Sequence, residues 1–479
     1  MMGRLASMAA LTVVVALSAS AGRAGAPRPP GLQTAIFPPL ELTEDASAAF
    51  LHARAAGATA IRLPLDWADV APSARPADFD EANPDDPAYR WSRADSLIRL
   101  AASFGLQPIL CIYDAPTWAS QAGQAGLGPR RPSPTDFGRF GTAAALRYGG
   151  ADAGLPRVRY WQAWNEPNLQ FFLMPQYIRG LPASGAVYRG LLNAFAVAVH
   201  GVHADNVVIT GGLVPFRNPD TPSATVSPLR FMRDVLCMSA GATPHPTCRA
   251  KARFDVWATH PYTAGGPFHS AHLADDVSLG DLPEMNKLLR AAVRAHHVVS
   301  AQPVRFWVTE FSWDTNPPDP GGVPLELHAR WVSEALYQMW RSGVTLATWF
   351  SLHDEGMGKG MQFQSGLWFD GAGGYGQPKP ALEAFRFPFV AYLRGQSVFV
   401  WGRTPRGAAG KVTIQLKPNG PFAWRRLKTL QTSNGVFTTT IPVVAAPSDT
   451  VRAVFGGEQS RGFSLIVPPD VVYQPFGTH

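Results

Sequence analysis

The feature that most constrains the fold is a regular alternation, from residue 30 to about 390, of short apolar runs and stretches with helical periodicity. Runs rich in β-branched and aromatic residues are typical of buried strands, and apolar positions three to four residues apart are typical of amphipathic helices. The runs begin near Gln33, Thr59, Gln107, Val158, Asn206, Phe254, Val304 and Thr345, at intervals of 26 to 51 residues. Eight such units predict a closed (β/α)8 barrel, a TIM barrel, whose active site lies at the carboxyl ends of the strands.

An open, doubly wound sheet is the alternative α/β architecture, but no glycine-rich phosphate-binding turn follows the first run. Helix boundaries fit the barrel. Ser133-Pro134 and Ser227-Pro228 each place a capping side chain before a proline at the first helical position. The segments 92–104 and 325–340 carry apolar positions at helical spacing and stop near a glycine, and 379–394 predicts the last helix of the barrel.

Beyond the barrel the pattern changes to the alternation typical of half-buried strands. Expected strands are 412–416, 424–432, 436–441, 451–455 and 463–467, and Ser433-Asn434-Gly435 predicts a hairpin between the second and third. We therefore expect a barrel domain over 27–392 and a β-sandwich over 393–479, which loosely resembles immunoglobulin-like modules of bacterial secreted proteins. Because no glycine/serine-rich or proline-rich linker separates the two, the sandwich is expected to dock on the barrel.

Residues 1–26 have the pattern of an export signal peptide. Arg4 precedes the apolar segment 9–17, and Ala21 and Ala26 each end a small-residue cleavage site. A retained membrane anchor is the alternative, but the apolar segment is short for a bilayer, and no other segment approaches ~18 uninterrupted apolar residues. We therefore expect a secreted protein, with no stable membrane insertion once the signal is removed.

Composition and charge exclude further classes of protein. With 46% hydrophobic and 16% charged residues, the chain is neither disordered nor a coiled coil. The formal charge is +7, and loss of Arg4 and Arg23 with the leader leaves +5. This excess is scattered rather than clustered, so nucleic acid is not an expected partner.

The three cysteines have different expected roles. Cys237 and Cys248 are separated by ten residues, and in an oxidising compartment they are expected to form a disulfide. Cys111 lies in an apolar strand and is expected to be an inert core residue. No cysteine–histidine cluster has the spacing of metal ligands, so neither a metal nor a cofactor is implied.

Two carboxylates stand where predicted strands end. The fourth strand ends in Trp164-Asn165-Glu166-Pro167 and the seventh in Thr309-Glu310-Phe311. Each glutamate alone is explained equally well by an ordinary ion pair in a loop. The fourth and seventh strands lie across a barrel from one another, however, so both carboxylates can point into one cleft. Cleavage of a glycosidic bond uses such a pair: one carboxyl protonates the leaving oxygen, and the other attacks the anomeric carbon.

At these motifs the sequence resembles the clan A glycoside hydrolases, particularly families 5 and 39. The resemblance covers about residues 32–392, and its specificity comes from the combination of motifs. It implies a retaining (β/α)8 enzyme in which Glu166, after Asn165, is the acid/base and Glu310 is the nucleophile.

The candidate substrate-binding residues are Arg62, Trp118, Asn165, His260, Tyr262 and Trp349. The resemblance implies that the arginine supports the nucleophile, that the tyrosine hydrogen-bonds it, and that the strand-eight tryptophan lies under the sugar ring. Structural roles are the alternative: Arg62 would tie strand ends together, His260 would be a satisfied core histidine, and the tryptophans would be packing. The third strand, ending in Tyr113, lacks the histidine that several clan members place there.

The expected function is a secreted glycosidase that cleaves O-glycosidic bonds in oligosaccharides or polysaccharides with retention and without a cofactor. The alternatives are a catalytically silent carbohydrate- or cell-wall-binding protein, a transglycosylase with the same residues, and a structural surface protein. Asp66, Asp114 and Asp354 are alternative carboxylates near strand ends. A retaining pair predicts carboxyl groups about 5 to 5.5 Å apart, and the charge of Glu310 is expected to raise the pKa of Glu166. The sandwich is expected to be dispensable for chemistry, because every candidate catalytic residue precedes residue 392.

Overall fold

A computed structural model describes the chain between residues 31 and 476, apart from five short gaps. The described ranges are 31–120, 131–152, 154–217, 220–356, 363–371 and 374–476. The predicted signal peptide, 1–26, lies outside them. Within these ranges, no helix is both long enough and apolar enough to cross a membrane.

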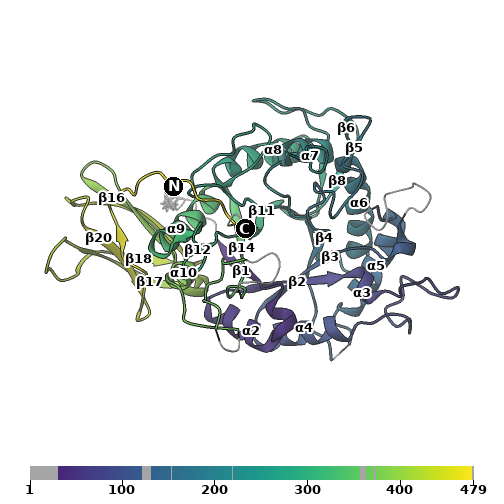
Figure 1. Cartoon of the computed structure of the whole chain (residues 1–479), viewed down its shortest axis with the longest axis horizontal. Helices are drawn as coiled ribbons and strands as arrows, with labels where there is room; N and C mark the ends of the chain where they lie inside the picture. Colours follow the sequence, from purple (N-terminus) through teal and green to yellow (C-terminus); the bar gives the residue numbers. More distant parts are fainter. Residues whose placement is uncertain are drawn as a thin grey trace, which may run out of the picture.

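Eight parallel strands close into a barrel, as the alternation of apolar runs predicts (Figure 1). In order around the barrel they are β1 (Gln33–Phe37), β2 (Ala60–Asp66), β3 (Gln107–Tyr113), β4 (Tyr160–Ala163), β7 (Val207–Thr210), β9 (Val256–Thr259), β11 (Arg305–Phe311) and β14 (Val344–Phe350). Each begins within two residues of its predicted start. Because β14 pairs with β1, the sheet is closed, and the doubly wound alternative is wrong.

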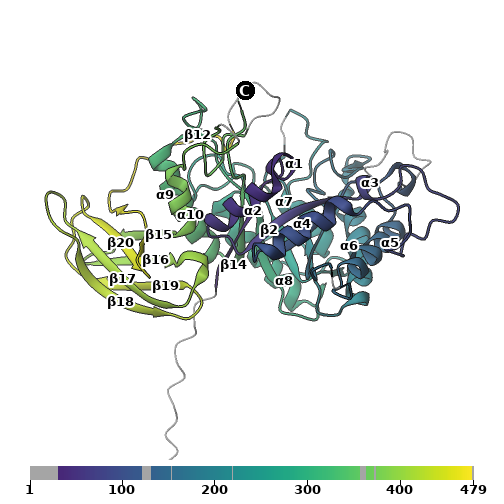
Figure 2. The same cartoon turned by 90° about the horizontal axis from the view of Figure 1, so that it is seen from below.

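Helices surround the barrel and connect its strands (Figure 2). They are α1 (Glu41–Glu44), α2 (Ala46–Ala55), α3 (Trp67–Val70), α4 (Ser92–Ser103), α5 (Pro134–Arg147), α6 (Ser184–Val202), α7 (Pro228–Leu236), α8 (Leu282–Arg294), α9 (Leu325–Arg341) and α10 (Pro380–Arg386). Short elements fill the connections: η1 (Thr117–Ala119), η3 (Leu279–Asp281), the antiparallel pair β5 (Tyr177–Ile178) and β6 (Leu181–Pro182), and the parallel pairs β8 (Ala252–Arg253) with β10 (Val298–Val299) and β12 (Thr315–Asn316) with β13 (Val323–Pro324).

The predicted helix boundaries at α5, α7 and α9 are confirmed. The Ser133 hydroxyl accepts a hydrogen bond from Asp136 N at 3.3 Å, and Pro134 occupies the first turn of α5. α7 likewise begins after its serine–proline pair. α9 ends two residues before Gly343, whose φ of 88° is a backbone conformation that favours glycine.

The interior of the barrel changes from apolar to polar along the strands. An apolar layer receives side chains from all eight strands, among them Ala60 and Trp307, with Tyr160 packed against it. Two residues further along the same strands come Arg62, Thr309 and Gln162, all buried. Because side chains alternate in a strand, residues two apart share a face, so these polar groups lie on the inner face directly beyond the apolar layer.

The residues after α10 form two antiparallel sheets (Figure 1). The first contains β15 (Phe389–Leu393), β16 (Ser397–Arg403) and β19 (Val436–Pro442), and the second contains β17 (Gly410–Lys417), β18 (Arg425–Thr432), β20 (Thr450–Phe455), β21 (Glu458–Gln459) and β22 (Phe463–Ser464). A 3₁₀ turn, η4 (Pro405–Gly407), follows β16. The two sheets fit the predicted β-sandwich, and its immunoglobulin-like topology stays a prediction.

The prediction of one helix over 379–394 is wrong. α10 ends at Arg386, and β15 then pairs antiparallel with β16 in the first sheet of the sandwich. Pro388, which stands between them, cannot continue a helix because it lacks a backbone N–H. The predicted domain boundary after residue 392 therefore falls inside β15.

The predicted hairpin at Ser433-Asn434-Gly435 is also wrong, although the flanking strands exist. β18 pairs with β17 and β19 pairs with β16, so the turn carries the chain from one sheet to the other. The crossing is tight, since a Cβ on Gly435 would lie 2.4 Å from the Cα of Gly407. Gly435 also has a φ of 79°, which explains why a glycine follows the asparagine here.

The sandwich packs against α9 and α10 of the barrel (Figure 2), which confirms the expected docking. Trp401 of β16 lies against Tyr337 and Trp340 of α9, with ring centroids 5.5 and 5.7 Å apart. The buried Arg403 donates a hydrogen bond to Leu32 O at 2.7 Å, just before β1. Apolar and polar contacts therefore both hold the two domains together.

A C-terminal segment, residues 465–476, leaves the sandwich and runs back toward the middle of the barrel (Figure 1). It is anchored there by the backbone: Gly265 N donates to Tyr473 O at 2.7 Å, and Asp314 N donates to Pro475 O at 2.9 Å. The last described residues of the predicted accessory domain therefore lie on the barrel, among the loops that follow β9 and β11.

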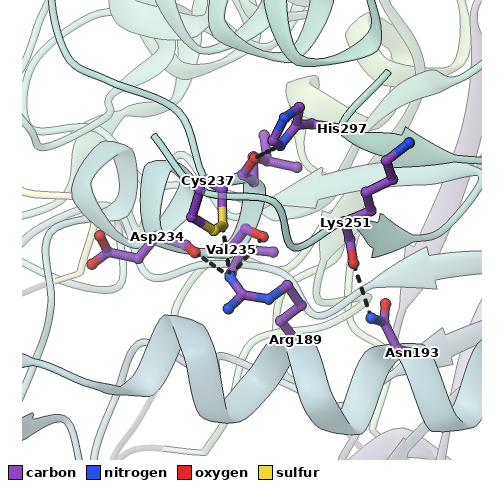
Figure 3. Close-up of a disulfide and its surroundings, with 9 residues drawn as sticks. Arg189, Asn193, Asp234, Val235, Cys237, Lys251 and His297 are labelled. Carbon is purple, nitrogen blue, oxygen red and sulfur yellow. Dashed lines mark hydrogen bonds between the residues drawn. A yellow bond between two sulfur atoms is a disulfide. The ribbon is translucent and has the colours of Figure 1, made fainter. Parts of the chain in front are cut away.

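Cys237 and Cys248 form the predicted disulfide, with Cα atoms 5.3 Å apart. Cys237 ends α7 with a φ of 52°. Arg189, from α6, donates hydrogen bonds to the carbonyl oxygens of Asp234 at 2.6 Å and Val235 at 3.2 Å (Figure 3). The guanidinium thus binds carbonyl groups that the end of a helix leaves without intrahelical partners.

Candidate active site

A cavity of about 620 Å³ lies at the carboxyl ends of the barrel strands. Five predicted site residues line it: Arg62, Asn165, Glu166, Tyr262 and Glu310. Among the described residues of the lining, the arginine and the two glutamates carry the only charges. The two carboxylates from β11 and from the loop after β4 therefore do share one cavity.

Both carboxylate oxygens of Glu310 accept hydrogen bonds. Arg62 Nη1 donates to Oε1 at 2.5 Å, and the Tyr262 hydroxyl donates to Oε2 at 2.8 Å. Burial raises the pKa of Tyr262 well above its usual value, so this hydroxyl keeps its proton for Glu310. The side chain of Glu310 is only 10% exposed. A carboxylate held between a guanidinium and a phenol is oriented by both hydrogen bonds and is placed to act as a nucleophile.

Arg62 is itself fixed by its other nitrogens. Its Nε donates to Gln162 Oε1 at 2.7 Å, and its Nη2 donates to Asn165 Oδ1 at 2.7 Å and contacts Cys111 Sγ at 3.1 Å. Cys111 is buried, and burial raises its pKa to about 11, so it remains a neutral thiol. Its burial and neutral thiol agree with the expected core role, and it also lines the cavity and contacts the arginine.

Glu166 lies in a loop in which two non-glycine residues have positive φ angles. Glu166 has a φ of 40° and Trp164 a φ of 78°, both in the left-handed region. The side chain of Asn168 fixes the loop by donating to Val214 O and Val226 O at 3.1 and 3.0 Å. This support lets the chain turn the Glu166 carboxyl into the cavity.

Burial raises the pKa of Glu166 to about 7, and the positive charge of Arg62 opposes this rise. The direction agrees with the prediction from the sequence. The cause is removal of the carboxyl from water, however, and not the charge of Glu310. A carboxyl with a pKa near neutrality can donate a proton and later take one back, which is what a general acid/base requires.

His260 connects Glu166 to the polar layer of the barrel. Its Nδ1 lies 2.9 Å from Glu166 Oε1, and its Nε2 lies 3.0 Å from Thr309 Oγ1, which also accepts a hydrogen bond from Gln162 Nε2 at 3.2 Å. Burial lowers the pKa of His260 to about 4, so the ring is neutral. Gly212 makes room for it, because a Cβ there would lie 1.8 Å from Nε2.

A neutral imidazole has one N–H, so His260 donates through one nitrogen and accepts through the other. With Glu166 ionised, Nδ1–H donates to its carboxylate and the Thr309 hydroxyl donates to Nε2. With Glu166 protonated on Oε2, Oε1 still accepts from Nδ1–H, and the tautomer of His260 does not change. Both protonation states of Glu166 therefore have a complete hydrogen-bond chain without movement of any heavy atom.

Glu166, His260 and Glu310 offer one atom each within 4.8 Å of one another. Among the described residues this is the only group of three with the spacing of metal ligands. The positively charged guanidinium of Arg62 has its Nη1 2.5 Å from Glu310 Oε1. Its charge would repel a cation at the same oxygen. The distance also means that a carboxylate oxygen of Glu166 lies within 4.8 Å of one from Glu310.

The two predicted tryptophan contacts are corrected by the structure. Trp349 is fully buried, donates from Nε1 to Ser365 O at 3.0 Å and does not line the cavity. Its neighbour Phe350 does, because successive side chains of β14 point to opposite faces. Trp118 donates from Nε1 to Pro72 O at 2.7 Å and also lies outside the lining.

The sequence analysis missed most of the apolar and aromatic lining, including Tyr113, Phe350 and Phe476. Tyr113 ends β3, where the family pattern places a histidine, so strand position was a usable signal for it. Phe476 belongs to the C-terminal segment, and its ring centroid lies 4.7 Å from that of Tyr262 and 5.1 Å from that of Phe363. The domain after α10 thus supplies a side chain to the cavity, and its dispensability for chemistry stays a prediction.

The alternative carboxylates do not line this cavity. Asp354 is fully buried and pairs with Lys379 Nζ at 2.5 Å, while Gly366 N donates to the same oxygen at 3.0 Å. Asp66 accepts a hydrogen bond from Asp69 N and so caps α3. Both carboxylates have structural roles.

The barrel has the fold of (β/α)8 glycoside hydrolases. A family 39 glycoside hydrolase from the gut symbiont Bacteroides cellulosilyticus WH2 matches with a TM-score of 0.51 and 16% identity, over 88% of this chain and 80% of its own. A glucosidase from Croceicoccus marinus matches with a TM-score of 0.50 and 12% identity, over 91% of this chain and 96% of its own. The resemblance to clan A glycoside hydrolases is thus confirmed at the level of the fold. A scan against protein-family models finds no match, and neither does a search of curated proteins.

Proposed function

We propose that the chain is a retaining glycoside hydrolase that cleaves O-glycosidic bonds, with Glu166 as acid/base and Glu310 as nucleophile. The observation that carries the proposal is the pairing of these two carboxyls in one cavity, where the first has a pKa of about 7 and the second is held by Arg62 and Tyr262. Two carboxyls in unlike environments are the arrangement that assigns one to proton transfer and the other to attack.

In the first step a carboxylate oxygen of Glu310 attacks the anomeric carbon, and the bond from that carbon to the leaving oxygen breaks. Glu166 gives its proton to the leaving oxygen, so the alcohol departs neutral. His260 keeps its tautomer through this step, and its Nδ1–H hydrogen-bonds Oε1 of the new carboxylate of Glu166.

In the second step Glu166 takes a proton from water, the resulting oxygen attacks the anomeric carbon, and the bond to Glu310 breaks. The carboxylate of Glu310 is released into the hydrogen bonds from Arg62 and Tyr262, which stabilise it as a leaving group. Two displacements at one carbon retain its configuration.

The closeness of the nearest oxygens of the two carboxyls fits a retaining pair. An oxygen of Glu166 lies within 4.8 Å of one from Glu310. Retaining pairs are about 5 to 5.5 Å apart, whereas inverting pairs leave ~6.5 to 9.5 Å for a water molecule.

Export is part of the proposal, because residues 1–26 have the charge and apolar pattern of a signal peptide. Carbohydrate is the proposed substrate class, in line with the fold shared with the glycosidases. The intact mass of the secreted protein tests export, and a mass that begins at Met1 would contradict it.

The experiment on activity is a panel of nitrophenyl glycosides, in both anomeric configurations of several hexoses, pentoses and a hexuronic acid. We expect turnover of at least one by the wild type, none by Glu310→Gln, and wild-type turnover by Glu284→Gln, which removes an exposed carboxylate on α8. Proton NMR of the first product formed should show the anomer of the substrate. Unchanged turnover by Glu310→Gln would contradict the assignment.

A further inference from the structure

The cavity wall beside Glu166 is built from apolar side chains. We define the apolar wall as Leu169 and Phe172 from the loop after β4, and Val214, Pro215, Phe216 and Thr225 from the loop after β7. β4 and β7 are paired neighbours in the barrel, so the two loops lie side by side. None of these six residues is charged, and the Thr225 hydroxyl is the one polar side-chain group among them.

The apolar wall lies where the leaving group departs. Leu169 is in the same loop as Glu166, and Leu169 N donates to Glu166 O at 2.9 Å. An acid that protonates the leaving oxygen must touch that oxygen, so the group attached to it lies on the side of Glu166. Glu310, on β11, stands on the other side of β9 from these loops.

Backbone groups of the wall already form hydrogen bonds with other parts of the protein. Val214 exchanges two hydrogen bonds of 3.1 Å with the Asn168 side chain, and Thr225 O accepts from the Tyr177 hydroxyl at 3.2 Å. A second sugar in this position would bring hydroxyl groups that lose water and find few partners. Unpaired polar groups of this kind cost binding free energy.

The side chains of the wall offer a surface that an apolar group would cover. Phe216 is 52% exposed, an unusual state for a ring in a cavity lining. Phe172 is held in place by ring contacts with Phe171 at 4.9 Å and Tyr113 at 6.2 Å. Covering these rings with hydrocarbon removes apolar surface from water on both partners.

We infer that the leaving group is apolar, so that the substrate is a glycoside of an alkyl or aryl alcohol whose hydrocarbon lies on the apolar wall. The inference rests on the proposed glycosidase function. It replaces the second sugar, expected for an oligosaccharide or polysaccharide substrate, by a hydrocarbon group in the position beside Glu166.

The test compares octyl, phenyl and methyl glycosides, and a disaccharide, of the sugar that the nitrophenyl panel identifies. Methyl and octyl alcohols are almost equally basic leaving groups, so their difference reports binding of the chain rather than chemistry. Below the micellar concentration, we expect kcat/KM for the octyl glycoside to exceed that for the methyl glycoside by about 50-fold, the value for about three buried methylene groups. Equal values, or a preference for the disaccharide, would overturn the inference.

The variant Phe216→Ser tests whether the apolar wall causes the preference for the octyl glycoside. It should lower the octyl-to-methyl ratio of kcat/KM by about tenfold. Phe422→Ser is the matched control, because Phe422 is 57% exposed in the sandwich and does not line the cavity. An unchanged ratio in Phe216→Ser would contradict the role of the wall. The phenyl glycoside shows whether an aromatic ring serves as well as a chain.

A binding measurement tests the apolar wall independently of the proposed glycosidase activity. If no glycoside is cleaved, the proposed function is wrong, and calorimetric titration with octyl and methyl β-D-glucopyranoside still tests the wall. Tighter binding of the octyl compound by the wild type, lost in Phe216→Ser, supports an apolar ligand. Equal binding of the two compounds refutes it.

Discussion

Replacing Glu166 by glutamine should make the protein more stable at alkaline pH than the wild type. The usual pKa of a glutamate is 4.5, and burial raises that of Glu166 to about 7 in the folded protein. Between these values the folded state binds more protons than the unfolded state, so the wild type loses stability as the pH rises. Integrated from pH 5 to pH 8, this loss is about 2.5 kcal/mol in the free energy of unfolding.

Glu166→Gln keeps the shape of the side chain and cannot ionise, so it escapes this loss. The neutral His260 has the opposite pH dependence, since its pKa of about 4 lies below the usual 6.5, but it is present in both proteins and cancels in the difference. Urea unfolding of wild type and variant, followed by tryptophan fluorescence at pH 5 and pH 8, measures that difference.

The stability of Glu166→Gln relative to wild type should rise by about 2.5 kcal/mol between the two pH values. Glu284→Gln removes a carboxylate from the surface of α8 and controls for the change in net charge. A wild-type-to-variant difference that is the same at pH 5 and pH 8 would refute the reasoning, because it would mean that Glu166 titrates alike in both states.

Three further predictions concern the rest of the site and the fold. Tyr262→Phe removes one hydrogen bond to Glu310 and should lower kcat/KM on the best nitrophenyl glycoside about 10- to 100-fold, with its circular dichroism spectrum unchanged. Phe476→Ala should raise KM by several-fold, because it opens one side of the cavity, and an unchanged KM would exclude contact with substrate. Replacing both Cys237 and Cys248 by serine should lower the free energy of unfolding by up to roughly 3 kcal/mol, measured by urea denaturation.

The barrel and its two carboxylates are predictable because their signals are local. Both glutamates stand near the carboxyl end of an apolar run: Glu166 is three residues after β4, and Glu310 is the last but one residue of β11. Trp349 is a harder case. Two bulky aromatic residues end β14, and a shift of one residue decides which of them, Trp349 or Phe350, faces the cavity. The apolar pattern is the same for either choice.

Contacts between distant segments are not predictable from local pattern. Phe476 contacts Tyr262 only because the C-terminal segment crosses from the sandwich to the barrel. The sequence around either residue contains no pattern that predicts this crossing. The turn at Ser433-Asn434-Gly435 is a second case in which distant pairing overrides a local pattern. Its residues specify a reversal of the chain, but pairing with β16 and β17 decides that β18 and β19 belong to different sheets.

The C-terminal segment returns to the barrel from the far end of the sequence. A chain is synthesised from its amino end, so all eight barrel strands precede the residue that completes the cavity, Phe476. In the folded protein the segment reaches the barrel from the sandwich, which packs on α9 and α10. A protein that lacks this segment therefore carries both glutamates but leaves one side of the cavity open.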